Sequence, residues 1–201
     1  LDRRRHGRLE SFDGRTVDAR GTLGERGQPY AMRATWIDFD ETHVEAANVV
    51  VGIDPEAGAL PAGTPAVLEL STQHFHANER EIVLDGKAHA TGRTGQGEGW
   101  EIDSGTLRIT GDFQRDAKLD RKAIAWIEAT GGFTATLQDR ARAIGDTLRG
   151  NADTTRIEGS PARLELVSRA GAVLESSWIQ YDAENLLLSS DKGKLTPVGG
   201  A

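Results

Sequence analysis

The strongest constraint on the fold is a series of short segments in which apolar and polar residues alternate. Many such segments follow one another along the chain, rich in Val, Ile, Leu, Thr and aromatic residues and separated by Gly, Asp, Asn or Pro. Neighbouring side chains of an extended strand point to opposite faces, so this alternation is typical of half-buried strands. The sequence therefore predicts an all-β fold. The expected strands lie at 31–39, 43–51, 66–76, 81–84, 99–103, 106–113, 123–129, 133–137, 155–158, 163–167, 173–181 and 186–189.

Two windows interrupt this pattern. Apolar residues from Leu137 to Leu148 recur at helical spacing, and Gly150 is a suitable residue to end a helix. This spacing predicts a short helix or an irregular crossing over 138–149. The charged window 114–122 is also compatible with a turn of helix. Neither window indicates a second domain.

Glycine-containing turns are expected between several strands. Asp85-Gly86 directly follows the expected strand 81–84, and this dipeptide is a strong hairpin signal. The glycine-rich stretch 95–99 is interpreted as a hairpin loop. A nucleotide-binding glycine motif would have to be followed by a helix, and no helix is expected after this stretch. The chain is therefore expected to be built from hairpins.

The composition limits the classes of function to consider. The chain has 201 residues and a net charge of −7, with 24 Lys and Arg against 31 Asp and Glu. This balance does not suit the neutralisation of phosphates, so nucleic acid is not an expected partner. The chain has no cysteine, which excludes disulfides, thiolate nucleophiles and cysteine-bound metals. No apolar run approaches the length of about 20 residues that a helical membrane span needs.

A basic run lies near the N-terminus, where four arginines fall within residues 3–8. Such a run fits a solvated terminus, and it also fits a segment beside a membrane anchor that precedes it. We expect a flexible basic segment at 1–14 and a single elongated β domain at 15–198.

The chain repeats a short motif around its tryptophans. Trp36, Trp126 and Trp178 are each followed by Ile and then by an acidic or amide residue. The strongest echo pairs residues 35–40 with 177–182, and in both copies a turn and an apolar strand follow. The unequal spacing of the copies excludes a solenoid with one fixed rung length. The sequence therefore predicts a hairpin unit that is repeated with insertions.

Each unit has one apolar face and one more polar face. Ile37 and Phe39 share a face of their strand, as Ile179 and Tyr181 do in the second copy. The tryptophan falls on the opposite face among polar residues. A lone hairpin is marginal in water, so stacked hairpins are expected to form two long sheets whose apolar faces meet.

The C-terminal part of the chain carries a family resemblance. Its elements are Gly-Ser-Pro-Ala-Arg-Leu-Glu-Leu at 159–166, a hairpin through 170–171, Leu-Glu-Ser-Ser-Trp-Ile-Gln-Tyr-Asp at 174–182 and Asn-Leu-Leu-Leu at 185–188. These residues resemble the OstA-like repeat of the periplasmic proteins that transport lipopolysaccharide. The resemblance is most specific over 155–193, while 31–51 is similar to the second half of the unit and 63–92 to the first half.

This resemblance implies both a fold and a function. The family fold is an open β-jellyroll, a sheet folded like a taco, whose apolar interior holds acyl chains and whose end edges pair with neighbouring domains. The chain would then be a non-enzymatic periplasmic bridge domain that shields the acyl chains of lipopolysaccharide or a related envelope glycolipid. Its expected partners are that lipid and other OstA-like domains, including copies of itself, and no cofactor is expected. The expected lipid-facing residues are Ile37, Phe39, Val44, Ala46, Leu68, Leu70, Ile127, Ile179, Tyr181, Leu186 and Leu188.

The same apolar residues also fit a dry, closed sandwich core, because periodicity does not separate a core from a lipid-lined groove. A dry core corresponds to a structural or adhesive β-repeat module whose partner is another protein. A glycan-active enzyme on a β-solenoid is a third alternative, and it requires two carboxylates in one cleft. Asp residues at strand ends more often form turns, so no catalytic residue is assigned. The acidic residues weighed here are Asp38, Asp40, Asp103 and Asp182.

Histidines form the remaining candidate site. His74 and His76 alternate on one strand face, and His89 follows a short distance later. Two imidazoles on one face suit zinc, with Glu79 or Asp85 as a further ligand. Surface histidines on half-exposed strands are the more common case. The sequence therefore predicts no metal site.

Overall fold

The computed structural model is built from antiparallel β-strands, so the predicted all-β fold is confirmed. The described part of the chain contains no helix, and therefore none long and apolar enough to cross a membrane. The structure describes residues 7–11, 13–23, 28–40, 42–53, 68–93, 99–111, 124–138, 140–151, 153–167 and 171–197.

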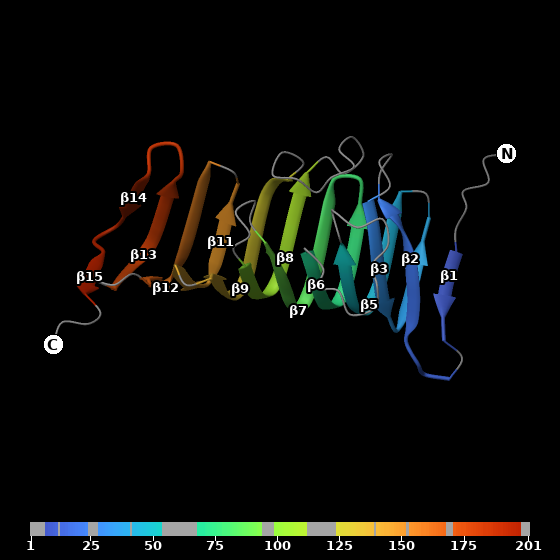
Figure 1. Ribbon diagram of the computed structural model, residues 1–201. Helices are drawn as coiled ribbons and strands as arrows, with labels where there is room; N and C mark the ends of the chain where they lie inside the picture. The colour runs from blue at the N-terminus through green and yellow to red at the C-terminus, as the bar shows by residue number, and fades with distance from the viewer. Residues whose placement is uncertain are drawn as a thin grey trace.

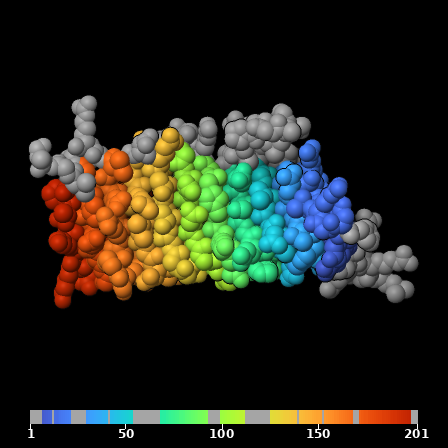
Figure 2. Space-filling view, turned by 90° about the horizontal axis from the view of Figure 1, so that it is seen from below, coloured from blue at the N-terminus to red at the C-terminus, as the bar shows by residue number. Residues whose placement is uncertain are grey.

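The described part of the molecule is elongated, with β1 and β15 at opposite ends (Figure 1). Colours follow one another from end to end in chain order, so strands that are close in sequence are close in space (Figure 2). The strands are β1 (Gly7–Glu10), β2 (Val17–Leu23), β3 (Gln28–Ala34), β4 (Trp36–Phe39), β5 (His43–Ile53), β6 (Leu68–Asn78), β7 (Glu81–Arg93), β8 (Gly99–Gly111), β9 (Ile124–Leu137), β10 (Ala141–Gly145), β11 (Thr147–Gly150), β12 (Thr154–Leu166), β13 (Ala172–Asp182), β14 (Leu187–Ser190) and β15 (Lys194–Pro197).

The 15 strands form one sheet that is folded into two arms. The long strands β5–β9, β12 and β13 pass through both arms, and the pairing registers shift where several of them cross from one arm to the other. We call the line through these crossings the fold line. The first arm has the order β1-β4-β5-β6-β7-β8-β9-β11-β12-β13-β14. The second arm has the order β2-β3-β5-β6-β7-β8-β9-β10-β12-β13-β15.

Left-handed backbone conformations mark the fold line. Gly86 in β7 and Gly131 in β9 have φ angles of 76° and 77°, which glycine adopts without the steric cost of a side chain. Asn48 in β5 also has a positive φ, and Asn tolerates this region better than most residues. These residues allow long strands to turn from one arm into the other without ending.

A close backbone approach adds to the bend between β10 and β11. A Cβ atom on Gly145 would lie 2.6 Å from the carbonyl oxygen of Glu158 in β12. No real side chain fits at that distance, so glycine is favoured where the chain passes from β10 to β11 at the fold line.

The hairpin prediction at Asp85-Gly86 is wrong. Both residues lie within β7 at the fold line, and the strand continues to Arg93. A glycine with positive φ serves a bend and a hairpin turn equally well, so the sequence signal was ambiguous. The same effect joined the described parts of other expected pairs into single strands. The expected strands 99–103 and 106–113 contribute to β8, 123–129 and 133–137 to β9, and 155–158 and 163–167 to β12.

The expected strand 31–39 is wrong in the opposite way, because one predicted strand is two strands in the structure. This segment divides at Thr35 into β3 of the second arm and β4 of the first. The hairpin loop expected at 95–99 falls almost entirely outside the described residues, although β7 and β8 on either side of it do pair antiparallel.

The predicted helix over 138–149 is also wrong. This window forms β10 of the second arm and β11 of the first. Leu137 ends β9 and Ala141 begins β10, and the two residues pair across the turn between these strands. Their four-residue spacing therefore comes from a tight turn and not from a helix. The chain changes arm at Gly145, so the inward and outward alternation of side chains in β10 does not continue into β11. The other helical candidate, 114–122, lies outside the described residues.

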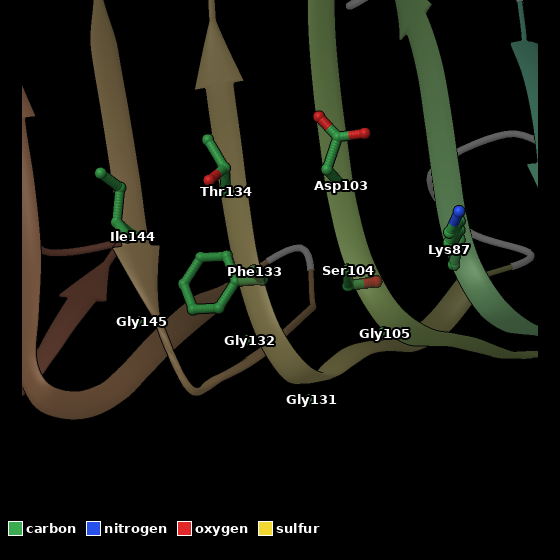
Figure 3. Close-up of a pocket in the computed structure, with 11 residues that line it drawn as sticks. Lys87, Asp103, Ser104, Gly105, Gly131, Gly132, Phe133, Thr134, Ile144 and Gly145 are labelled. Carbon is green, nitrogen blue, oxygen red and sulfur yellow. The ribbon is translucent and has the colours of Figure 1, made fainter.

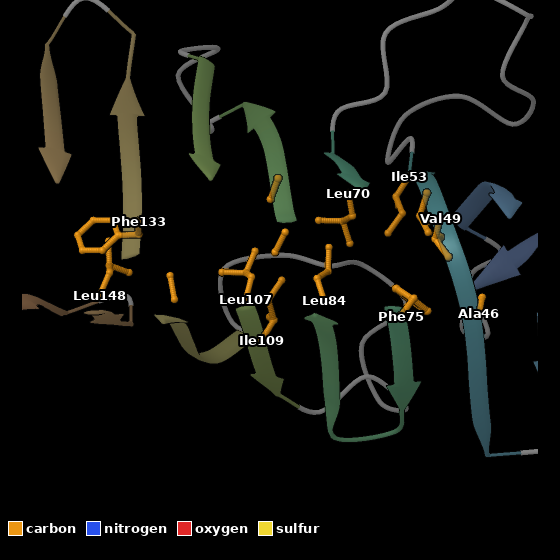
Figure 4. Close-up of a cluster of buried hydrophobic side chains, with 14 of the residues drawn as sticks. Ala46, Val49, Ile53, Leu70, Phe75, Leu84, Leu107, Ile109, Phe133 and Leu148 are labelled. Atoms are coloured by element: carbon orange, nitrogen blue, oxygen red, sulfur yellow. The ribbon is translucent and has the colours of Figure 1, made fainter. Parts of the chain in front are cut away.

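The inner faces of the two arms meet in one hydrophobic core (Figure 4). Leu84 and Leu107 point inward from the first arm, Val49 and Leu70 point inward from the second, and all four are at most 1% exposed. Burying a side chain of this size stabilises the fold by about 1.5–3 kcal/mol relative to leaving it exposed. Contacts between these facing rows hold the two arms together in the middle of the molecule.

The sheet begins inside the expected N-terminal segment. Residues Gly7–Glu10 form β1, which pairs with β4 at the end of the first arm. The guanidinium of Arg8 lies 5.0 Å from the centre of the Trp36 ring. The β-structure therefore starts before residue 15.

Candidate functional site

Most of the expected lipid-facing residues lie on the inner face of the two arms. Strand alternation therefore placed them on the correct side of the sheet. Seven of these residues belong to the described hydrophobic core or pack against it. Those buried in the core are Ile37, Ala46, Leu70 and Ile179, and those half-buried at its margin are Val44, Leu68 and Ile127.

Three of the expected residues lie on the inner face but remain exposed near the ends of the molecule. Phe39 is 38% exposed near the N-terminal end, on the first arm. Tyr181 and Leu188 are 41% and 39% exposed at the C-terminal end, where they pair across β13 and β14. The inner face is therefore closed in the middle and accessible at its ends.

The placement of Leu186 on this face is wrong. Leu186 lies in the turn between β13 and β14, has a φ of 52° and is 78% exposed. The carboxylate of Asp182 accepts hydrogen bonds from the backbone and the side chain of Asn185, which fixes this turn. The three consecutive leucines give no sequence signal for the start of β14, which begins at Leu187.

An apolar lip marks the C-terminal end of the inner face. Tyr181 pairs with Leu188 in the first arm, and Leu174 pairs with Leu195 in the second. We define the C-terminal lip as Leu166, Tyr181, Leu188 and Leu195, which are 40%, 41%, 39% and 66% exposed. Among the described strands, β14 and β15 each pair with β13 alone. Leu188 and Leu195 therefore have a neighbouring strand on one side only, whereas Leu166 and Tyr181 have a paired strand on each side.

The N-terminal end presents a smaller apolar surface. Leu9 on β1 is 42% exposed and pairs with the buried Ile37, and Phe39 is a second exposed inner residue at this end of the first arm. In the second arm, the half-buried Val17 and Ala19 of β2 pack against the core. The two ends of the inner face are thus unequal, and the C-terminal lip is the larger candidate surface.

The outer face of the first arm repeats one contact three times. The side chains of Trp36, Trp126 and Trp178 each lie under an arginine, with distances from guanidinium carbon to ring centre of 5.0, 4.7 and 4.7 Å. The arginines are Arg8, Arg149 and Arg156, each from a paired strand. This confirms the predicted outward placement of the repeated tryptophans, and each contact contributes about 0.5–1 kcal/mol at an exposed site.

A hollow of about 500 Å³ lies at the fold line, with walls from β7, β8, β9 and β10 (Figure 3). Asp103 is the one carboxylate among its 11 lining residues, and its Oδ1 lies 2.7 Å from His89 Nδ1. The hydroxyl of Ser104 donates to the carbonyl of Thr106. Glycoside hydrolysis needs two carboxylates around one bond, so this hollow does not favour the glycan-enzyme alternative.

Two of the weighed carboxylates have the turn role that the sequence indicates. The bond from the backbone N–H of Thr42 lowers the pKa of Asp40. Bonds from the side chain and then the backbone of Asn185 lower the pKa of Asp182. Asp103 differs, since it lies in the middle of β8 rather than at a strand end.

The histidines are grouped differently from the expectation. His89 lies in β7 beside Asp103, and its ring does not join His76. His76 is instead accompanied by His43 and Glu45 from β5. Sequence reasoning missed His43 because the contact depends on the register between β5 and β6. The available signal was the alternation of His43 and Glu45, which puts both on one face.

The two other candidate ligands have different positions. The carboxylate of Asp85 accepts a hydrogen bond from the hydroxyl of Thr106 at 2.7 Å. Glu79 lies in the turn between β6 and β7. Neither residue belongs to a described cluster of possible metal ligands.

Comparisons with known proteins give no match from which a function could be inferred. No protein-family model, no curated protein and no solved structure matches the chain. The inner face and the C-terminal lip are therefore the basis of the functional argument.

Proposed function

We propose that this chain is a non-enzymatic lipid-handling domain of the periplasm. It shields acyl chains of lipopolysaccharide or a related envelope glycolipid and docks edge to edge with similar domains. The observation that carries this proposal is the C-terminal lip, where the apolar inner face reaches the end of both arms without being covered. Single exposed apolar residues are ordinary, but a group that continues a hydrophobic core is typical of a binding surface.

The burial of the inner face suggests where a lipid binds first. Leu84 and Leu107 are at most 1% exposed in the middle, whereas Leu164 and Leu174 beside the lip are only half-buried. An acyl chain would therefore contact the lip first, and deeper binding would require the arms to part from that end. Each methylene group removed from water stabilises the complex by about 0.8 kcal/mol, so short acyl segments at the lip contribute measurable affinity.

The same end supports edge-to-edge docking. Strands β14 and β15 are the outermost described strands of the two arms, and each pairs with β13. An outer strand presents backbone N–H and C=O groups that can extend a sheet into a second molecule. A partner that adds strands here would also cover the C-terminal lip and lengthen the apolar surface.

The test uses two neighbouring leucines on β14. Leu188 belongs to the lip, whereas Leu187 lies on the opposite face and is 55% exposed. We expect Leu188→Asp to weaken the binding of purified lipopolysaccharide about tenfold or more, because a carboxylate would be placed against acyl chains. Leu187→Asp adds the same charge to the same strand and should bind as the wild type does. Native mass spectrometry and a titration with labelled lipopolysaccharide measure both.

Both substitutions replace exposed residues, so both variants should fold, and circular dichroism checks this. Equal binding by the two folded variants would overturn the role of the lip. Absence of any lipopolysaccharide binding by the wild type would overturn the proposed function.

The alternative is a structural or adhesive module with a dry core. The observation that favours it is the fully buried middle of the inner face, including Leu70, Leu84 and Leu107. Regular end-to-end assembly of the purified chain without bound lipid, seen by light scattering and native mass spectrometry, would support this alternative.

A further inference from the structure

We propose that His43, Glu45 and His76 form a zinc-binding site on the outer face of the first arm. This site is independent of the lipid-handling function proposed above. Imidazole nitrogens and a carboxylate oxygen are ligands that Zn²⁺ accepts, and two His with one Glu is a known zinc ligand set. The three side chains are partly exposed, so an ion can reach them from solvent.

The register between β5 and β6 brings these residues together. Glu45 pairs directly with His76, and His43 lies two residues from Glu45 on the same strand face. This pairing lies at the end of both strands, since His43, the first residue of β5, pairs with Asn78, the last residue of β6. The candidate ligands are therefore held by backbone pairing rather than by a loop.

The observed distances are close to those of a metal centre. His43 Nε2 lies 3.2 Å from Glu45 Oε1, and His76 Nδ1 lies 3.9 Å from the same oxygen. Zinc bonds of about 2.0–2.2 Å in a tetrahedron place ligand atoms about 3.3–3.5 Å apart. The centres of the two imidazole rings lie 4.4 Å apart, and the rings meet edge to face. Small side-chain rotations would thus bring three ligand atoms around one ion, with a water in the fourth position.

A further carboxylate is placed to orient His76. Glu81 Oε1 lies 3.9 Å from His76 Nε2, on the side of the ring away from Glu45. A zinc-bound histidine usually donates its second ring N–H to a carboxylate or similar acceptor, which fixes the tautomer. We assign Glu81 this positioning role. The amide nitrogen of Asn78 lies 3.2 Å from His76 Nε2, while its oxygen accepts from the backbone N–H groups of Arg80 and Glu81. Zinc binding at Nδ1 would therefore replace the contact of Nε2 with Asn78 by one with Glu81.

The surroundings of the site favour a cation. Asp38 of β4 pairs with Glu45 across the strands, and Asp40 is close enough to His43 to interact electrostatically. Glu81 adds a third acidic group, and Arg108 lies 3.7 Å from its other oxygen. Arg108 lies beside Glu81, and Arg8 of β1 pairs with Asp38. The carboxylates of Asp38, Asp40, Glu45 and Glu81 still give the described surroundings of the site an acidic character, which attracts a divalent ion.

The second group of possible ligands provides a contrast. His89 lies near Glu101 and Asp103, at 3.8 and 2.7 Å from Nδ1, but it supplies only one imidazole. Transition metals such as zinc bind imidazole better than an exposed carboxylate pair. We therefore expect the site on β5 and β6 to bind zinc more tightly.

The main test is isothermal titration of the purified chain with zinc chloride near neutral pH. We expect one saturable zinc per chain, and we expect His43→Gln and His76→Gln each to weaken it about tenfold or more. His74→Gln is the matched control, because His74 lies on the same face of β6 but outside the cluster. His89→Gln is the control for the other cluster. Both controls should retain the wild-type affinity.

Two further measurements separate a metal site from a surface effect. Cobalt(II) bound in place of zinc should give the visible absorption of a tetrahedral centre, and this absorption should be lost in His76→Gln. Glu81→Gln should weaken zinc binding about tenfold without changing the melting temperature of the metal-free protein. Absence of saturable binding, or equal losses in His74→Gln and His76→Gln, would overturn the proposal.

Discussion

The middle and the C-terminal end of the inner face differ in burial although their residues follow the same pattern. Leu107 in β8 is 1% exposed, whereas Leu195 in β15 is 66% exposed. Both are leucines on the inner face of a strand. β8 has a strand on each side and faces the opposite arm, while β15 pairs only with β13 among the described strands. A side chain's place in the sheet therefore decides its burial.

This difference changes the choice between a dry core and a lipid-lined groove. The middle of the face has the burial of a dry core, and the proposal of lipid binding rests on its C-terminal end. The middle is closed by contacts between the arms, and the C-terminal lip leaves apolar area uncovered. A domain that handles acyl chains needs both properties, because the closed part supplies stability and the open part supplies a binding surface.

The largest expected effect contrasts one leucine from each region. Leu107→Ala should lower the free energy of unfolding by about 2–5 kcal/mol, since it removes buried methyl groups and leaves a cavity. Leu195→Ala should change it by less than about 0.5 kcal/mol, because most of that side chain is already in water. Urea unfolding followed by tryptophan fluorescence measures both. Similar losses in the two variants would contradict the regional difference.

A smaller loss in the free energy of unfolding is expected for a substitution at the fold line, where the chain passes from one arm to the other. Gly145→Ala would place a Cβ atom 2.6 Å from a backbone oxygen of β12, so the strands must shift. We expect a loss of about 1–3 kcal/mol in the free energy of unfolding.

Gly99→Ala is the matched control for this variant. Its Cβ would approach only the flexible end of the Gln138 side chain, at 3.1 Å. A change of less than about 0.5 kcal/mol is expected there. If chemical denaturation gives equal losses for both glycines, the fold line does not depend on the close approach at Gly145.

The smallest effect concerns the turn that positions the lip. Hydrogen bonds from Asn185 lower the pKa of Asp182 below its ordinary value of 3.8. A carboxyl with a lowered pKa in the folded state stabilises the protein above that ordinary value, and the contribution is lost as the pH falls through the lowered pKa. Asp182→Asn does not titrate. The wild type should therefore be slightly more stable than Asp182→Asn at pH 7, with the difference disappearing as the pH falls below about 4.

Thermal unfolding of both proteins across this pH range measures the difference. A constant difference from neutral to acidic pH would show that the charge of Asp182 does not stabilise the turn. Thr42 makes the corresponding bond to Asp40 at the N-terminal end, so Asp40→Asn is the matched variant for the other turn.

The faces of the strands were predictable from the sequence. Ile37, Ala46 and Ile179 lie in the core because alternation assigns each residue to one side of its strand. The tryptophans follow the same alternation, which places one on the outer face and another on the inner face. Trp178 precedes Ile179 and faces outward, whereas Trp100 is two residues before Ile102 and packs against the core with it.

The strand boundaries and cross-strand partners were less predictable. The positive φ at Gly86 indicated a reversal of direction but not whether the chain would form a hairpin or a bend. The four-residue step from Leu137 to Ala141 did not distinguish a helix from a tight turn between two paired strands. The meeting of His43 with His76 depended on a register that neither strand specifies alone.

The sequence by itself determined the all-β class and the side of the sheet on which most apolar residues lie, because both follow from local alternation and turn residues. Only the tertiary structure decided which strands pass through both arms, which part of the inner face is closed and which side chains gather on the outer surface. These properties depend on contacts between residues far apart in the chain. The same leucine is core where a second arm covers it and a candidate binding surface where the sheet ends.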